Sequence, residues 1–318
     1  MTKRQVPELN LIDYIEGSAQ ERQSFTDAFY NGLVDYGFIV LNPHDFDFQL
    51  VEDCYDLFKQ FFALPTEIKQ KYNLDNGGRR GYIPKLVEHA KDNKSNPDLK
   101  EFWHVGREVS ADNPLSQEYP ANVWADAEIK HFKEKTYALY EQLDRTALTM
   151  FSSLASALDV SPDYFEKLTY DGNSILRAIH YPPTSEFGLK NSLRAAPHED
   201  INLLTLLVGA TDSGLELLDH DGNWLAIDST PNQIVVDSGD MLSRMCNDVI
   251  PATTHRVVNP QTDNTARYSM PFFCHPHPDA VLSCIPSCEG DGAKYPDITS
   301  RDFLNQRIKD IGLESNKS

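Results

Sequence analysis

The sequence pattern changes near Tyr170, and this change is the strongest constraint on the fold. Before Tyr170, apolar residues recur mostly at helical spacing. After it, short β-rich runs are separated by Gly, Pro, Asp and Asn, and residues 219–223 carry a hairpin-turn signal. Many short strands at close spacing are typical of a sandwich or barrel. The pattern therefore predicts an α+β chain with a mainly β core, a β-barrel or jelly roll behind a helical N-terminal section.

The apolar periodicities locate the expected elements. We expect helices over residues 21–36, 48–62, from 64–67 onward, 125–158 and 301–311. We expect strands over residues 38–41, 175–181, 201–208, 215–218, 224–227, 233–236, 253–258 and 268–273, and a loop over 77–82. In domain terms, we expect 1–170 to be a helical N-terminal region with short strands, 171–290 to be the β core, and 291–318 to be a C-terminal helix and tail.

The composition limits the classes of function. With 318 residues and 40% hydrophobic content, the chain can bury a substantial core. Its formal charge of -19 disfavours nucleic acid and anionic membrane surfaces as partners. Five cysteines, an odd number without a C-x-x-C pair, favour reduced thiols in a cytoplasm. We find neither an apolar signal-peptide core nor an apolar run of membrane-spanning length, so we expect a cytoplasmic protein.

The most specific pattern is the ordered set His198, Asp200 and His255. In an extended segment, side chains at i and i+2 share a face, so His198 and Asp200 can point into the core together while Glu199 points away. His255 lies in a later expected strand, which a barrel can bring alongside them. Two histidines and one carboxylate can cap one face of an octahedral metal and leave three positions open, as in non-haem Fe(II) oxygenases.

Arg267 and Ser269 lie two residues apart on the next expected strand, so they can be neighbours of His255. An arginine and a hydroxyl at this spacing can hold the far carboxylate of a small dicarboxylate co-substrate. Taken singly, each of these residues has an ordinary structural explanation. H-x-D recurs at residues 277–279 and R-x-S at 22–24, but one combination alone has H-x-D, a distal His and R-x-S in order on β-type segments. The combination of these residues in order, rather than any one of them, therefore indicates the metal and co-substrate sites.

Four further segments carry a family resemblance. They are residues 6–11 (VPELNL), 33–38 (LVDYGF), 176–183 (LRAIHYPP) and 239–242 (GDML), followed by the His255-Arg256-Val257 strand. With them, nearly the whole chain resembles the isopenicillin N synthase-like branch of the 2-oxoglutarate- and Fe(II)-dependent dioxygenases, in its bacterial form. One departure is Ile179, because plant members often carry Asn two residues before the tyrosine that corresponds to Tyr181.

The resemblance implies a double-stranded β-helix (jelly roll) with Fe(II) bound by His198, Asp200 and His255. It implies that Arg267 and Ser269 hold 2-oxoglutarate. Tyr181 falls where the family places a tyrosine that contacts this co-substrate. The expected reaction is oxidation of a C–H bond of a small-molecule substrate by O2, by hydroxylation or desaturation, with release of succinate and CO2. A monomer or weak homodimer is expected.

Substrate contacts and two other functions stay open. Five residues are candidates for contact with substrate, four at the mouth of the site and Phe273 near the iron: Arg80, Tyr82, Phe102, His104 and Phe273. We expect His180, His275 and His277 to be structural. One alternative is an Fe(II) oxidase of the isopenicillin N synthase type, in which the R-x-S pair binds a substrate carboxylate and 2-oxoglutarate is not used. The other is a non-enzymatic metal-dependent binding protein on the same fold.

Overall fold

The computed structural model describes residues 4–74, 79–85, 100–183, 194–211, 214–259 and 265–310. Two residues of the expected 77–82 loop, Gly77 and Gly78, lie outside these ranges. Ile311, the last residue of the expected C-terminal helix, also lies outside the described residues.

The helices largely follow the apolar periodicity. They are α1 (Leu11–Ile15), α2 (Ala19–Tyr36), α3 (Phe48–Phe62), α4 (Thr66–Lys69), α5 (Phe132–Ala157), α6 (Tyr164–Thr169), α7 (Asp240–Met245) and α8 (Ser300–Asp310). Ser18 and Glu21 form a capping box at the start of α2, and Gly37, at φ 69°, ends it in the left-handed conformation. The long helix begins at Phe132 rather than near Ala125, because residues 126–131 form turns. No helix within the described ranges is both long and apolar enough to cross a bilayer.

The strands form two main sheets and a small hairpin. They are β1 (Glu8–Asn10), β2 (Phe38–Asn42), β3 (Gly81–Ile83), β4 (Glu101–Gly106), β5 (Ile175–Tyr181), β6 (Ala195–His198), β7 (Leu204–Val208), β8 (Leu215–Leu218), β9 (Trp224–Ala226), β10 (Ile234–Ser238), β11 (His255–Val257), β12 (Arg267–Cys274), β13 (Val281–Leu282) and β14 (Ile298–Thr299). The larger sheet has the order β1-β2-β10-β7-β12-β5-β4-β3, the smaller one β6-β11-β8-β9, and β13 pairs with β14. The predicted jelly roll with a helical section is confirmed.

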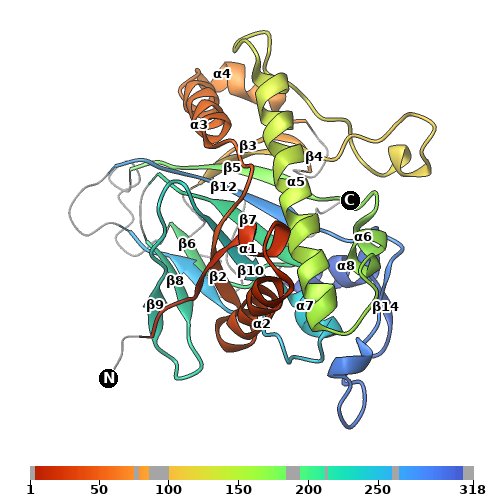
Figure 1. Cartoon of the computed structure of the whole chain (residues 1–318). Coiled ribbons are helices and arrows are strands. Elements are labelled where there is room, and N and C mark those ends of the chain that lie inside the picture. Colours follow the sequence, from red (N-terminus) through yellow and green to blue (C-terminus); the bar gives the residue numbers. More distant parts are fainter. Residues whose placement is uncertain are drawn as a thin grey trace.

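The larger sheet crosses the domain boundary expected at residue 170. Its strands β1 to β4 come from the N-terminal section and pair into the same sheet as the core strands. Helices α2, α3 and α5 cover one face of this sheet. Helix α5 crosses over several of its strands (Figure 1). Even-numbered side chains of β7 and β12, such as Leu206 and Phe272, point into this helix-covered core.

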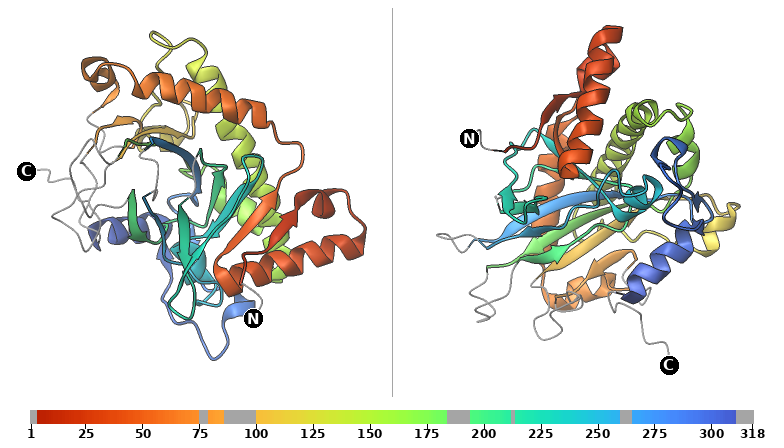
Figure 2. Two further views of the ribbon diagram at one scale, coloured as in Figure 1. Left: turned by 90° about the vertical axis from the view of Figure 1, so that its left-hand side faces the viewer. Right: turned by 90° about the horizontal axis from the view of Figure 1, so that it is seen from below.

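The opposite face of the larger sheet packs against the smaller sheet. Phe102, Ile179 and Tyr181 of the larger sheet share one apolar cluster with Ala195 and Val257 of the smaller sheet. Figure 2 gives two further views of the strands. We call the region between these two faces, in which side chains of both sheets meet, the intersheet cavity. Every second residue of β4, β5 and β12 faces it.

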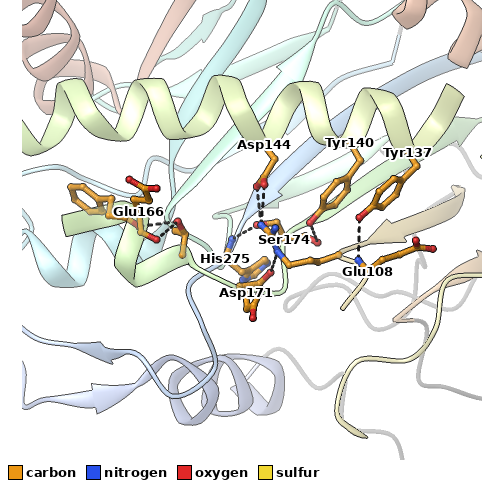
Figure 3. A network of polar contacts seen from close by, with 12 residues as sticks. Glu108, Tyr137, Tyr140, Asp144, Glu166, Asp171, Ser174 and His275 are labelled. Atoms are coloured by element: carbon orange, nitrogen blue, oxygen red, sulfur yellow. Dashed lines mark hydrogen bonds and ion pairs between the residues drawn. The ribbon is translucent and has the colours of Figure 1, made fainter. Parts of the chain in front are cut away.

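Polar contacts fasten α5 to the ends of β4 and β5. Figure 3 shows Tyr140 and Asp144 pointing from α5 toward the segment that contains Ser174, and Tyr137 pointing toward Glu108. The Tyr140 hydroxyl donates to the Ser174 carbonyl at 3.2 Å. Asp144 pairs with Arg107, which follows β4, at 3.0 Å. These contacts fix the helix against the strands that line the cavity.

One sequence expectation about the sheets is wrong. The strand that carries Arg267 and Ser269 does not neighbour the strand that carries His255, because β12 lies between β5 and β7 in the larger sheet while β11 lies in the smaller one. The chain crosses from one sheet to the other between the two strands. The Arg-x-Ser pair therefore faces the histidine from across the intersheet cavity.

Candidate metal centre

Strand pairing brings the three expected ligands together. His198 ends β6, Asp200 follows two residues later, and His255 opens β11. His198 and His255 are register partners in the antiparallel pair of β6 and β11. The candidate ligand atoms of the three residues all lie within 4.8 Å of one another, and no other cluster of this kind occurs among the described residues.

The two imidazoles are oriented for metal binding. Nδ1 of His198 lies 2.7 Å from the carbonyl oxygen of Ala196, and Nδ1 of His255 lies 3.1 Å from that of Thr253. Because a carbonyl oxygen only accepts, each Nδ1 carries the proton and each Nε2 keeps a lone pair. Both Nε2 atoms face Asp200, at 3.9 and 3.8 Å from its Oδ1. This donor set fits a divalent iron.

The Asp200 carboxylate is held from behind. The Thr205 hydroxyl donates to Asp200 Oδ2, and the Asn202 amide donates to the Thr205 hydroxyl at 2.8 Å. Asp237 of β10 is the register partner of Thr205. Its burial, together with the charge of Asp200, raises the pKa of Asp237 well above its ordinary value. One carboxylate oxygen of Asp200 therefore accepts a hydrogen bond from Thr205, and the other faces the histidines.

The centre is buried on one side and open on the other. The side chains of Asp200 and His255 are each 9% exposed, whereas that of His198 is 46% exposed. Phe38 packs edge-on against the His255 ring at 5.6 Å between centroids. The solvent-exposed side of the centre is therefore at His198.

Arg267 and Tyr181 form a second, buried group in the intersheet cavity. They are register partners across β12 and β5, and the Arg267 guanidinium lies 5.3 Å from the centroid of the Tyr181 ring. Ser269 lies two residues along the same face of β12, and all three side chains are buried. A guanidinium, a hydroxyl and an aromatic wall suit a carboxylate. Ile179, the departure from the plant pattern, is the register partner of Ser269 and makes this part of the wall apolar.

Three of the five substrate candidates lie on the cavity face. Phe102 and His104 share a face of β4, with ring centroids 4.9 Å apart. The Arg177 guanidinium lies 4.4 Å from the centroid of Phe102 and 5.3 Å from that of Phe273, and its Nε donates to His104 Nε2 at 2.7 Å. Arg177 was not expected from the sequence, although its two-residue spacing from Ile179 and Tyr181 places it on the same face.

The other two candidates, Tyr82 and Arg80, lie elsewhere. Tyr82 pairs with Trp103 across β3 and β4, which turns it to the helix-covered face. Its hydroxyl donates to Glu101 at 2.5 Å. Arg80 is fully buried against the backbone of Gly106 and donates to Asn173 at 2.7 Å. Neither side chain is placed to line the mouth of the cavity.

His275 continues the cavity face of β12 beyond Phe273. Its backbone N–H donates to the Ser174 hydroxyl at 3.2 Å. Figure 3 shows the two residues in contact. Burial lowers the pKa of His275 to about 4, and Arg177 and Arg80 act in the same direction while Asp200 opposes them. The ring is therefore neutral near pH 7. Its place at the cavity was not foreseen, because a single histidine after a strand carries no signal in the sequence.

Two family models match the chain in the order of its two sections. Residues 9–127 match a family model that is described as the N-terminal part of the non-haem dioxygenase in morphine synthesis. Residues 172–276 match the model of the 2OG-Fe(II) oxygenase superfamily. The second match contains all three metal-ligand candidates, Arg267 and Ser269.

Relatives and solved structures agree with the family models. A 2-oxoglutarate-Fe(II) type oxidoreductase of Emericella nidulans, hxnY, is 33% identical over 288 residues, which are 86% of this chain and 80% of that protein. A Caulobacter crescentus protein described within the 2OG-Fe(II) oxygenase family is 39% identical, with a TM-score of 0.86 over 96% of this chain and 98% of that one. A full-length Neurospora crassa protein, solved in complex with alpha-KG, is 27% identical, with a TM-score of 0.85 over 96% of each chain.

Proposed function

Because this chain belongs to the 2OG-Fe(II) oxygenase superfamily and is a 2-oxoglutarate- and Fe(II)-dependent oxidoreductase, we propose which of its residues perform each task. His198, Asp200 and His255 hold the iron. Arg267, Ser269 and Tyr181 hold 2-oxoglutarate. The observation that carries the assignment is the convergence of two Nε2 lone pairs and one carboxylate oxygen on one point.

Iron, once bound, supplies the oxidation of a substrate C–H bond with O2 and 2-oxoglutarate, which leaves as succinate and CO2. The protein's own residues supply positive charge, orient the co-substrate and exclude water from it. Arg267 makes charge-assisted hydrogen bonds to the far carboxylate of 2-oxoglutarate, and Ser269 donates a further one. In a chain of net charge -19, a dianion needs such a local cation. Tyr181 covers the guanidinium and keeps water from it.

The two alternatives are less well supported. The Emericella relative named above is a 2-oxoglutarate-Fe(II) type oxidoreductase, and one structural neighbour contains alpha-KG. This favours use of 2-oxoglutarate over the oxidase reaction that omits it. The open side of the centre at His198 favours an enzyme over a binding protein, since a purely structural metal is normally enclosed.

On the substrate side, we propose that Phe102, His104, Phe273 and Arg177 form the contact surface. A guanidinium between two aromatic rings suits a small flat molecule with a hydrogen-bond-accepting oxygen. Thymine, bound in a structure of the Neurospora protein, belongs to this class. Thymine is therefore the first probe, with O2 uptake as the readout. With any molecule that stimulates uptake, Phe273→Leu should raise KM about 2- to 10-fold through the lost ring contact.

Two variants test the assignment of one set of residues to iron and another to 2-oxoglutarate. His255→Ala should abolish Fe(II) binding. Arg267→Ala should keep Fe(II) binding and raise the Kd of 2-oxoglutarate roughly 10- to 100-fold, because charged hydrogen bonds are lost. Both constants come from anaerobic calorimetry. If Arg267→Ala left 2-oxoglutarate affinity unchanged, its assigned role would be wrong.

We also propose a cytoplasmic location and a monomer or weak homodimer that acts on small molecules, without nucleic acid or membrane partners. The five cysteines are free thiols, which suits a reducing compartment.

A further inference from the structure

The segment that carries Asp200 is fastened to the start of α7 by backbone hydrogen bonds. The N–H of Asp240 donates to the Asp200 carbonyl at 2.9 Å, and the N–H of Met241 donates to the Asn202 carbonyl at 3.1 Å. The two segments pack so closely that a Cβ at Gly239 would lie 2.2 Å from the Asn202 side chain. Only glycine permits this approach. The position of Asp200 therefore depends on where α7 begins.

One side chain of the C-terminal helix reaches both segments. Arg307 of α8 places its Nε 2.6 Å from Asp240 Oδ2 and a terminal nitrogen 3.4 Å from Glu199 Oε2. Glu199 stands between two metal-ligand candidates in the chain. Its other oxygen accepts a hydrogen bond from the Thr254 hydroxyl at 3.3 Å, and Thr254 precedes His255. The guanidinium thus contacts directly the residue between His198 and Asp200, and that residue in turn contacts the neighbour of His255.

The surroundings make the Arg307–Asp240 pair stronger than a surface ion pair, whereas the side chain of Glu199 is 39% exposed. The side chains of Arg307 and Asp240 are only 26% and 11% exposed. A partly buried charged pair is less screened by water and salt than an exposed one. The planar fork of arginine can contact two carboxylates at once, which the single ammonium of lysine does less well.

We propose that Arg307 is a positioning residue that makes the ligand geometry of the iron centre depend on the seating of α8. With the guanidinium in place, Glu199 and Asp240 are held, and with them the backbone on both sides of Asp200. Without it, these segments relax and the affinity for iron falls. The inference rests on the metal assignment made above.

α8 has other anchors, so its docking can be separated from the role of Arg307. Arg301 on the same helix pairs with Glu118 and, at 2.6 Å, with Asp279, neither of which lies beside a metal-ligand candidate. Phe303 is buried and packs against the guanidinium of Arg244 at 5.4 Å. Replacing Arg307 should therefore leave the helix in place.

The experiment compares Arg307→Gln, Arg307→Lys and the matched control Arg301→Gln in the full chain. Anaerobic calorimetry gives the Kd of Fe(II), absorbance gives the charge-transfer band with 2-oxoglutarate, and circular dichroism gives the Tm without metal. Arg307→Gln should weaken Fe(II) binding about 10-fold or more, as loss of an outer-shell partner does. Arg307→Lys should recover part of this loss, and Arg301→Gln should bind Fe(II) like the original chain.

Two results would overturn the inference: unchanged Fe(II) affinity in Arg307→Gln, or an equal loss in Arg301→Gln, which would indicate helix docking alone. If Arg307→Gln does not fold, Glu199→Gln removes one of the two contacts and should give a smaller loss of Fe(II) affinity. In a chain that tolerates both changes, the two losses should be non-additive. Failure of the unaltered protein to bind Fe(II) would refute the proposed function instead, so the two failures are distinguishable.

Discussion

His198 and His255 stand directly opposite one another across the antiparallel pair of β6 and β11, with ring centroids 4.4 Å apart. A strand pair, rather than a flexible loop, therefore sets the spacing of two of the three metal-ligand candidates. Asp200 lies just beyond the end of β6 and needs additional support, which comes from Thr205, α7 and α8.

The first prediction concerns Thr205. Thr205→Val keeps the shape of the side chain but removes the hydroxyl that donates to Asp200. We expect the Kd of Fe(II) to rise about 10- to 100-fold, because the carboxylate loses its orienting hydrogen bond. Anaerobic calorimetry measures the constant, and Thr205→Ser, which keeps the hydroxyl, is the control. Equal affinities in the Val and Ser variants would contradict the role of the hydrogen bond.

The second prediction concerns the ring that covers Arg267. Tyr181→Leu should raise the Kd of 2-oxoglutarate roughly 10-fold, since the guanidinium loses its aromatic neighbour and gains water. Fe(II) affinity should not change. Tyr181→Phe keeps the ring, so comparing the two variants separates the ring from the hydroxyl. A Leu variant with unaltered 2-oxoglutarate affinity would remove Tyr181 from the co-substrate site.

The third prediction concerns a buried carboxylate behind the cavity. Glu101 is 1% exposed and is bonded to Lys69, Tyr82 and His180. Burial alone would raise its pKa, but hydrogen bonds from His180, Lys69 and Tyr82 outweigh burial and lower the pKa to about 2. Because the folded pKa lies below the unfolded value of about 4.3, the carboxylate stabilises the fold by about 3 kcal/mol above that pH.

Glu101→Gln should accordingly lower the free energy of unfolding by about 3 kcal/mol near pH 7. The difference from the original chain should shrink as the pH falls from about 4.5 toward 2, where the carboxylate becomes protonated. Urea unfolding at pH 7, 5 and 3.5 measures this difference. Glu67→Gln, at an exposed position on α4, is the control. A difference that did not vary with pH would mean that the charge of Glu101 is not what stabilises the fold.

The sequence allowed prediction of the β core and the ligand set because both depend on local patterns. The strand from Ile175 to Tyr181 has the expected bounds, and His198, Asp200 and His255 come together as expected. Such features can be predicted because residues close together in the chain keep their relative positions within a strand. Phe102 and His104, two of the substrate candidates, share a face of β4, although no strand was expected there.

Features that depend on which strands pair could not be predicted locally. Tyr82 was expected at the mouth, but its register with Trp103 turns it to the helix side, and a shift of one residue would have reversed this. The placement of β12 between β5 and β7 likewise depends on the whole sheet order. The contact from Arg307 to Glu199 joins residues 108 positions apart and has no local signature.

The most direct test of the account is an anaerobic titration of Fe(II)-loaded protein with 2-oxoglutarate, followed by visible absorbance. The account predicts a saturable charge-transfer band from the chelate, absent in His255→Ala and shifted to higher 2-oxoglutarate concentrations in Arg267→Ala. Fe(II) binding without any band would contradict the use of 2-oxoglutarate and favour the oxidase reaction. Failure to bind Fe(II) would contradict the metal centre itself.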